Sequence, residues 1–121
     1  MICYEMIGYF SDLPNSQTYP AAEFASLYPN TANFIVVVGI QEFEAFNHKF
    51  YTLMAKDSNI AVEAINFQDR EGLAGMSDQR NYWKFGYNAL MINDTSFLRN
   101  PNYHEMSDTI CLLYTSDAAD E

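Results

Sequence analysis

The hydrophobic residues of this chain fall into short runs that are typical of β-strands. The clearest is the continuous β-branched run at 33–39, a pattern that indicates a parallel strand covered on both faces. The apolar run that begins at Ile2 predicts a strand ending near Gly8, and residues 89–92 have the length of another buried strand. Residues 60–67 alternate in the manner of a fourth.

Between these strands the apolar residues change to helical spacing. Residues 41–56 carry large apolar side chains on one predicted face: Phe43, Phe46, Phe50, Leu53 and Met54. A proline at the start of 20–27 opens a one-turn helix. Ser77 suits the N-cap and Gly86 the end of a helix at 78–85. Because strands and helices alternate, we expect an α/β fold with a mostly parallel sheet flanked by helices.

Charge and composition exclude two classes of function. The chain has 16 acidic and 6 basic residues, a net charge of −10, so it lacks the basic footprint that nucleic-acid binding needs. No apolar run reaches the ~18 residues of a transmembrane helix. Nearly half of the residues are hydrophobic, which indicates a packed globular chain rather than a disordered one.

Two residues stand out as candidates for chemistry. Glu5 interrupts an apolar strand, and a buried carboxylate is costly unless it is paired, hydrogen-bonded or bound to a metal. Residue type alone favours a solvent-facing glutamate or a partner for an arginine. His104 is followed four residues later by Asp108, a pairing that can orient an imidazole as a base or a metal ligand. A histidine on a loop is otherwise usually just solvated.

Three ordered motifs resemble one known family. The segment 94–109, which contains Asn-Pro-Asn-Tyr-His104-Glu-Met-Ser-Asp108-Thr, is similar to the last metal-ligand segment of the zinc-dependent aminopeptidases. Tyr4-Glu-Met-Ile-Gly-Tyr9 resembles their strand end with an acidic zinc ligand, and Ser77-Asp-Gln-Arg-Asn-Tyr-Trp83 resembles their Ser-Asp-His turn. The resemblance covers residues 2–109. It implies a metallo-exopeptidase related to glutamate carboxypeptidase and glutaminyl cyclase.

The resemblance implies roles for particular residues. It makes Glu5 and His104 metal ligands in a site with two zinc ions that polarise a scissile peptide carbonyl and activate water. Around them it places second-shell or substrate-pocket residues: Asp78, Asp108, Tyr82 and Tyr103. The family usually has a histidine where this chain has Gln79, so substrate contacts of that turn are not carried over.

Neighbouring residues fit ordinary structural roles better. We expect Trp83 to lie in the core and Arg99 to brace the loop that begins at Asp94, rather than to hold a substrate carboxylate. His48 falls on the polar side of the 41–56 helix and has no assigned role.

The resemblance also implies an incomplete domain. Residues 1–110 correspond to the C-terminal portion of a catalytic domain, whereas 111–121 look like an in-frame translation of a sequencing-library adapter. The family takes further ligands and its general base from an earlier histidine and aspartate and a Glu-Glu pair. This chain has no Glu-Glu pair, and its only other histidine is His48. We therefore expect the chain to have a peptide substrate only together with a missing N-terminal part of the same domain, and to be inactive alone.

Two alternatives remain open. One is an acyltransferase with a single zinc, similar to glutaminyl cyclase, which a count of metal ions per intact chain would distinguish. The other is a binding or structural domain that kept the fold without the site. The upstream segment decides between this alternative and an enzyme.

Overall fold

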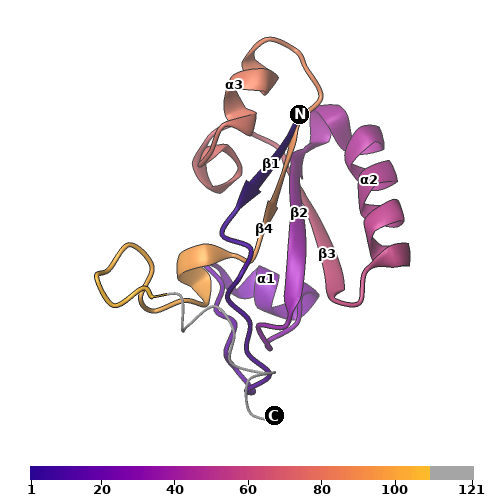
Figure 1. The fold of residues 1–121 in the computed structure, drawn as a ribbon. Helices are drawn as coiled ribbons and strands as arrows, with labels where there is room; N and C mark the ends of the chain where they lie inside the picture. The colour runs from indigo at the N-terminus through magenta and orange to yellow at the C-terminus, as the bar shows by residue number, and fades with distance from the viewer. Residues whose placement is uncertain (110–121) are drawn as a thin grey trace.

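The computed structural model describes residues 1–109, within which four strands form one sheet (Figure 1). The strands are β1 (Ile2–Glu5), β2 (Phe34–Ile40), β3 (Ala61–Phe67) and β4 (Leu90–Asn93), in the spatial order β1-β4-β2-β3. β1 pairs with β4 and β2 with β3 in parallel, whereas β2 and β4 run antiparallel. The predicted α/β class and mostly parallel sheet are confirmed, with helices beside the sheet.

β2 forms the centre of the core, and all seven of its residues are buried. Its side chains alternate between two apolar clusters because successive residues of a strand point to opposite faces. Ile35 and Val37 face α2 (Glu44–Asp57), while Val36 and Val38 pack on the other face with Cys3 and Met91 of the neighbouring strands. This double burial explains why the β-branched run could be recognised from the sequence.

The helix predicted at 41–56 is present as a 3-10 turn, Gln41–Phe43, followed by α2. Leu53, predicted on its buried face, is instead 56% exposed. The stripe that covers the sheet is rotated toward Asn47 and Tyr51. Asn47 is 2% exposed and donates through Nδ2 to Asn66 Oδ1 at 2.7 Å, so a buried polar contact sets the orientation of this helix.

The shorter helices match the predictions in place but not in every detail. α1 (Ala22–Leu27) lies within the predicted 20–27 helix. α3 (Gln79–Lys84) has Asp78 at its N-cap position, with no side-chain capping bond. The prediction of Ser77 as the N-cap was therefore wrong, since its hydroxyl donates instead to a carboxylate of β1. Gly86, with φ +76°, follows the helix end as predicted.

β1 is shorter than predicted. It ends at Glu5, where its ladder with β4 also ends, rather than near Gly8. The next residue, Met6, has φ +48°, which takes the chain out of the extended conformation. Met6 then accepts a hydrogen bond through its carbonyl from the Asp94 N–H at 2.6 Å.

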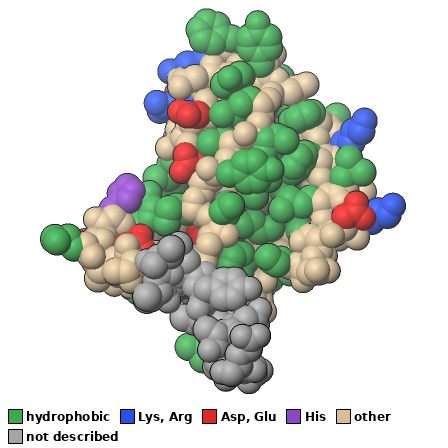
Figure 2. Space-filling view, in the orientation of Figure 1, with side chains coloured by type: hydrophobic (Ala, Val, Ile, Leu, Met, Phe, Trp, Pro, Cys, Tyr) green, Lys and Arg blue, Asp and Glu red, His purple; other side chains and the backbone are tan. Residues whose placement is uncertain are grey.

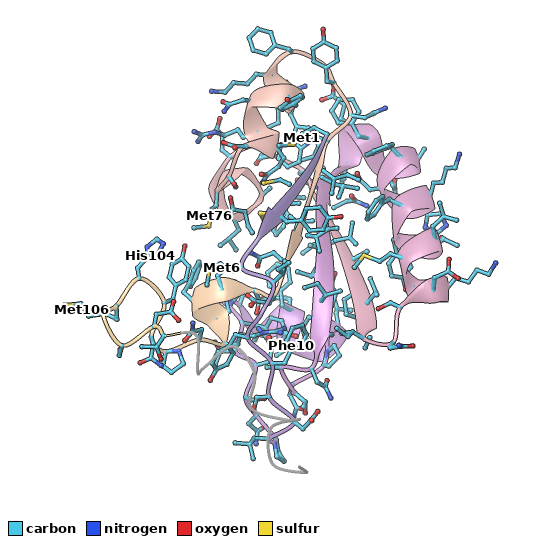
Figure 3. All side chains as sticks on the ribbon, in the orientation of Figure 1. Met1, Met6, Phe10, Met76, His104 and Met106 are labelled. Carbon is cyan, nitrogen blue, oxygen red and sulfur yellow. The ribbon has the colours of Figure 1, made fainter. Side chains whose placement is uncertain are left out.

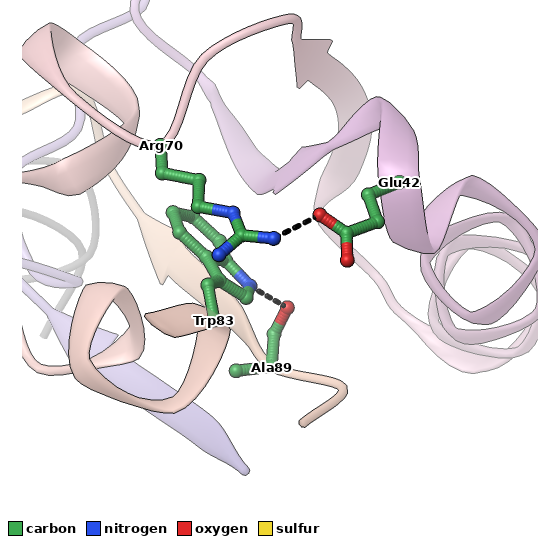
Figure 4. Close-up of polar contacts among 4 residues, drawn as sticks. All are labelled: Glu42, Arg70, Trp83 and Ala89. Atoms are coloured by element: carbon green, nitrogen blue, oxygen red, sulfur yellow. Dashed lines mark hydrogen bonds and ion pairs between the residues drawn. The ribbon is translucent and has the colours of Figure 1, made fainter. Parts of the chain in front are cut away.

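Trp83 lies in the core, as predicted. Its side chain is fully buried, and its Nε1 donates to the Ala89 carbonyl at 2.9 Å (Figure 4). Figure 4 also shows an ion pair between Arg70 and Glu42, which ties the loop after β3 to the turn before α2. The Trp83 hydrogen bond ties α3 to the residue that precedes β4.

The surface in Figure 2 is largely apolar over the middle of the sheet, with lysine and arginine side chains at the margins. His48 is exposed on α2, as predicted. Among the described residues, no helix has both the length and the apolar character needed to cross a membrane. The predicted adapter-like tail, 111–121, lies outside the described residues.

Candidate functional site

A cavity of about 330 Å³ opens where β1 and β4 end. Glu5 and Asn93 are the last partners of the parallel β1–β4 ladder, and both line the cavity. His104, on the loop that follows β4, lines it as well. Figure 3 shows Met6, Met76 and His104 on the same side of β1, whereas Met106 points away at the far end of the loop. Ligands in open α/β sheets bind at such carboxyl ends.

The carboxylate of Glu5 is held by a hydroxyl. Ser77 Oγ donates to Glu5 Oε1 at 2.5 Å, and the Cys3 thiol lies 3.8 Å from the same oxygen. Asn93 Nδ2 donates to the Glu5 backbone carbonyl at 2.6 Å. Within residues 1–109, Glu5 Oε2 accepts no hydrogen bond, so one carboxylate oxygen can bind a cation. A half-buried glutamate held on one side only is suited to that task.

His104 lies exposed at the mouth of the cavity. Its ring stacks on Tyr103 with centroids 3.9 Å apart and an interplanar angle of 18°. Tyr103 in turn packs against Phe97, with ring centroids 5.8 Å apart. The backbone of His104 has φ +63°. A residue with a Cβ adopts this left-handed conformation only when its surroundings hold it there.

The other predicted site residues divide into two groups. Tyr103 lines the cavity. Asp78 and Tyr82 are exposed and lie outside the cavity lining, because α3 turns Trp83 rather than Tyr82 inward. The carboxylate of Asp108 accepts a hydrogen bond from Asn100 Nδ2 at 3.1 Å. It therefore stabilises the loop and makes no hydrogen bond to the imidazole of His104.

The walls of the cavity are mainly apolar and aromatic. They include Tyr19, Phe24, Tyr28, Phe34, Val36 and Phe67. The Tyr19 hydroxyl donates to the Pro29 carbonyl at 2.6 Å and the Tyr28 hydroxyl to the Ala64 carbonyl at 2.9 Å. Burial raises the pKa of Tyr19 to about 12 and also raises the pKa of Tyr28. Both hydroxyls are thus neutral and engaged with the backbone, and the walls are suited to an apolar group.

Arg99 braces the loop that begins at Asp94, as predicted, because its Nε donates to Thr95 Oγ1 at 3.0 Å. It is 6% exposed and donates through Nη1 to the carbonyls of Phe34 at 2.9 Å and Ala32 at 3.2 Å. Its Nε donates to Gln17 Oε1 at 2.9 Å. Burial lowers the pKa of Arg99 to about 10, although the nearby Asp94 carboxylate opposes that shift. The brace therefore acts mainly through neutral oxygen acceptors.

Asp94 fixes the turn that leaves β4. Its carboxylate is fully buried and accepts hydrogen bonds from the N–H groups of Tyr9 and Ser96, each at 2.8 Å. Burial raises the pKa of Asp94, and the two backbone hydrogen bonds and Arg99 oppose that shift. The sequence indicated a loop here, and the structure adds that its aspartate is a core residue.

Ser77 is a site residue that the sequence did not reveal. It is a long way from Glu5 in the chain and looks like an ordinary helix cap. Only the packing of the loop before α3 against the end of β1 brings the two together. The six wall residues named above were missed for a similar reason, because each looks like a core residue in its own segment.

The donor set for a metal is partial within the described residues. No group of three or more histidine, cysteine, aspartate or glutamate side chains in residues 1–109 is close enough to hold an ion. Glu5 and His104 contribute two suitable donors to one cavity. Catalytic zinc sites generally use three protein ligands, so further donors would have to complete this one.

Comparison with known proteins gives a relative but no function. The chain is 39% identical over 110 residues to the uncharacterized protein YfbL of Escherichia coli (strain K12). The match covers 90% of this chain and 34% of the relative, so the chain spans about a third of the length of that protein. No protein-family model matches the chain, and no solved structure matches it either.

Proposed function

We propose that this chain is part of a zinc-dependent exopeptidase of the aminopeptidase type. Glu5 and His104 would be metal ligands, and Ser77 would hold the Glu5 carboxylate in place. One observation carries the proposal: Glu5 and His104 come from opposite ends of the chain, yet both line one cavity at the carboxyl ends of adjacent parallel strands. A carboxylate and an imidazole are the donor types that zinc takes in hydrolases.

The apolar walls of the cavity favour a substrate with an apolar side chain. Among residues 1–109, Glu5 is the carboxylate and His104 the imidazole of its lining, and neither lysine nor arginine is part of that lining. An apolar side chain would therefore be favoured over an acidic one, which needs a cationic partner. Zinc, when bound, would supply Lewis-acid activation of the scissile carbonyl. The chain's own residues would position the metal and enclose the side chain next to the reacting bond.

Zinc titration of the 121-residue chain tests the ligand assignment. Imidazole signals are followed by NMR, and the chain offers a matched control, since it has two histidines. We expect zinc to shift the His104 ring and the Glu5 carboxylate together. His104→Ala and Glu5→Gln should each weaken binding, and Ser77→Ala should weaken it about 10-fold, as loss of a group that orients a metal ligand typically does. His48→Ala should leave zinc binding unchanged.

Two results would overturn the assignment. One is an equal loss of zinc affinity in His48→Ala and His104→Ala, which would indicate surface binding only. The other is a zinc response of His104 without any response of Glu5.

The enzymatic part of the proposal needs the longer protein. The 121-residue chain should not hydrolyse aminoacyl-nitroanilides, since it supplies two donors and no Glu-Glu pair. A protein extended to the length of its relative should hydrolyse them and contain two zinc ions per chain. One zinc per chain would favour the acyltransferase similar to glutaminyl cyclase, and no zinc would favour a binding domain.

A further inference from the structure

A buried asparagine, Asn100, contacts the loop that carries His104. Asn100 is 1% exposed, so its side-chain amide must find partners within the fold. Its Oδ1 accepts from the Asn102 N–H at 2.9 Å, and its Nδ2 donates to Asp108 Oδ1 at 3.1 Å. One amide therefore contacts the loop both before and after His104.

The backbone of Asn100 adds two further contacts. Its N–H donates to the Ser96 carbonyl at 2.9 Å, and its carbonyl accepts from the Tyr103 N–H at 3.3 Å. Ser96 belongs to the turn after β4, which the buried Asp94 carboxylate fixes. Asn100 thus connects a rigid part of the core to the exposed loop at 102–108.

His104 depends on that connection for its position. Within residues 1–109 its imidazole makes no hydrogen bond, and its ring contact is the stack on Tyr103. Its left-handed backbone, with φ +63°, is unfavourable unless the loop imposes it. If the loop were released, the ring would have little reason to stay at the cavity mouth.

We propose that Asn100 is a positioning residue that holds His104 at the mouth of the cavity. Asparagine suits the task because it presents an acceptor to the Asn102 N–H and a donor to the Asp108 carboxylate at the same time. An aspartate at position 100 would keep the acceptor, lose the donor and face a like charge. The metal-binding consequence rests on the proposed function, whereas the loop geometry does not.

A charge swap across this hydrogen bond tests the proposal. Asn100→Asp should release the loop, so that the His104 ring signal moves toward that of an unstacked histidine. In the double variant Asn100→Asp with Asp108→Asn, the amide introduced at position 108 can donate to the carboxylate introduced at position 100. The His104 signal should then return to its parent position. The zinc affinity of His104 should fall about 10-fold or more in the single variant and recover in the swap.

The fold offers a matched control for the chemistry. Asn33 donates through Nδ2 to Asp12 Oδ1 at 2.9 Å, an exposed pair of the same residue types far from His104 in the chain. Asn33→Asp should leave the His104 signal and its zinc response unchanged. Fluorescence of the buried Trp83 reports whether each variant remains folded. If Asn100→Asp unfolds, Asp108→Ala and the swap test the proposal instead. Asp108→Ala keeps the neutral amide of Asn100, and the swap pairs the new carboxylate with the amide introduced at position 108.

The possible outcomes separate this inference from the proposed function. The inference is overturned if folded Asn100→Asp or Asp108→Ala leaves the His104 signal unchanged, or if the swap does not restore it. A parent chain whose His104 does not respond to zinc contradicts the metal assignment, while the swap still tests the loop. Zinc binding at His104 that is equal in the parent and in Asn100→Asp supports the metal site and refutes the positioning role.

Discussion

Replacing Gly39 by alanine tests the contact that orients α2 on the sheet. Gly39 lies in the buried strand β2, directly beneath the side chain of Asn47. A Cβ at this position would lie 1.9 Å from Asn47 Nδ2 and 2.8 Å from Asn66 Oδ1. No real Cβ contact is that short, so Asn47 or the helix that carries it must move.

The expected loss of stability follows from two effects. Overpacking of a well-packed interior costs about 1–3 kcal/mol. Displacing Asn47 also breaks its hydrogen bonds to Asn66 Oδ1 at 2.7 Å and to the Ile40 carbonyl at 3.3 Å. Each such bond contributes about 1 kcal/mol. Gly39→Ala should therefore lower the free energy of unfolding by about 4 kcal/mol, a large part of the roughly 5–15 kcal/mol of an ordinary domain.

Urea unfolding followed by the fluorescence of Trp83, the single tryptophan, measures this loss. Asn47→Ala removes the clashing amide. In that background Gly39→Ala should therefore lower the free energy of unfolding by about 2 kcal/mol less than in the parent. Gly72→Ala is the comparison, because φ is +63° there and, apart from its chain neighbours, no atom of residues 1–109 lies within 4 Å of the added Cβ. It should cost about 1 kcal/mol from backbone strain alone. A cost of Gly39→Ala that is unchanged by Asn47→Ala would refute the reasoning.

Two further predictions concern the turn and loop after β4. Burial raises the pKa of Asp94 above its ordinary 3.8, so the folded state binds this proton more tightly than the unfolded state, and the resulting stability is lost as pH rises through the folded pKa. The free energy of unfolding of the parent minus that of Asp94→Asn should therefore decrease from about pH 3 upward, and an increase with pH would contradict this. His104 has φ +63°, so His104→Gly should be more stable than His104→Ala by about 1 kcal/mol, measurable as a higher Tm. Equal Tm values would show that the left-handed backbone is not strained.

Strands and helices were predictable wherever a local pattern determined them. The β-branched run of β2 and the helical spacing of α2 are each complete within one segment. Gly86 was recognisable as a helix end because its positive φ is a local requirement of the backbone. Such features need no knowledge of which segments are neighbours.

Features that depend on contacts between distant segments were not predictable. Leu53 has the spacing of a buried residue, but the contact between Asn47 and Asn66 rotates the helix and leaves it exposed. Ser77 has the chemistry of an N-cap, but its hydroxyl meets Glu5, a residue on a different element. In both cases one polar contact overrides a pattern that is correct in isolation.

The presence of Glu5 and His104 in one cavity depends on strand order. Each residue follows or ends a strand, so the sequence could place both at carboxyl ends. It could not show that β1 and β4 are neighbours and parallel, which is what brings those two ends to the same edge of the sheet. Had the antiparallel β2 lain between them, an amino end would have separated the carboxylate from the imidazole. The candidate site is thus a consequence of topology, and a zinc response shared by both residues would be the chemical consequence of that pairing.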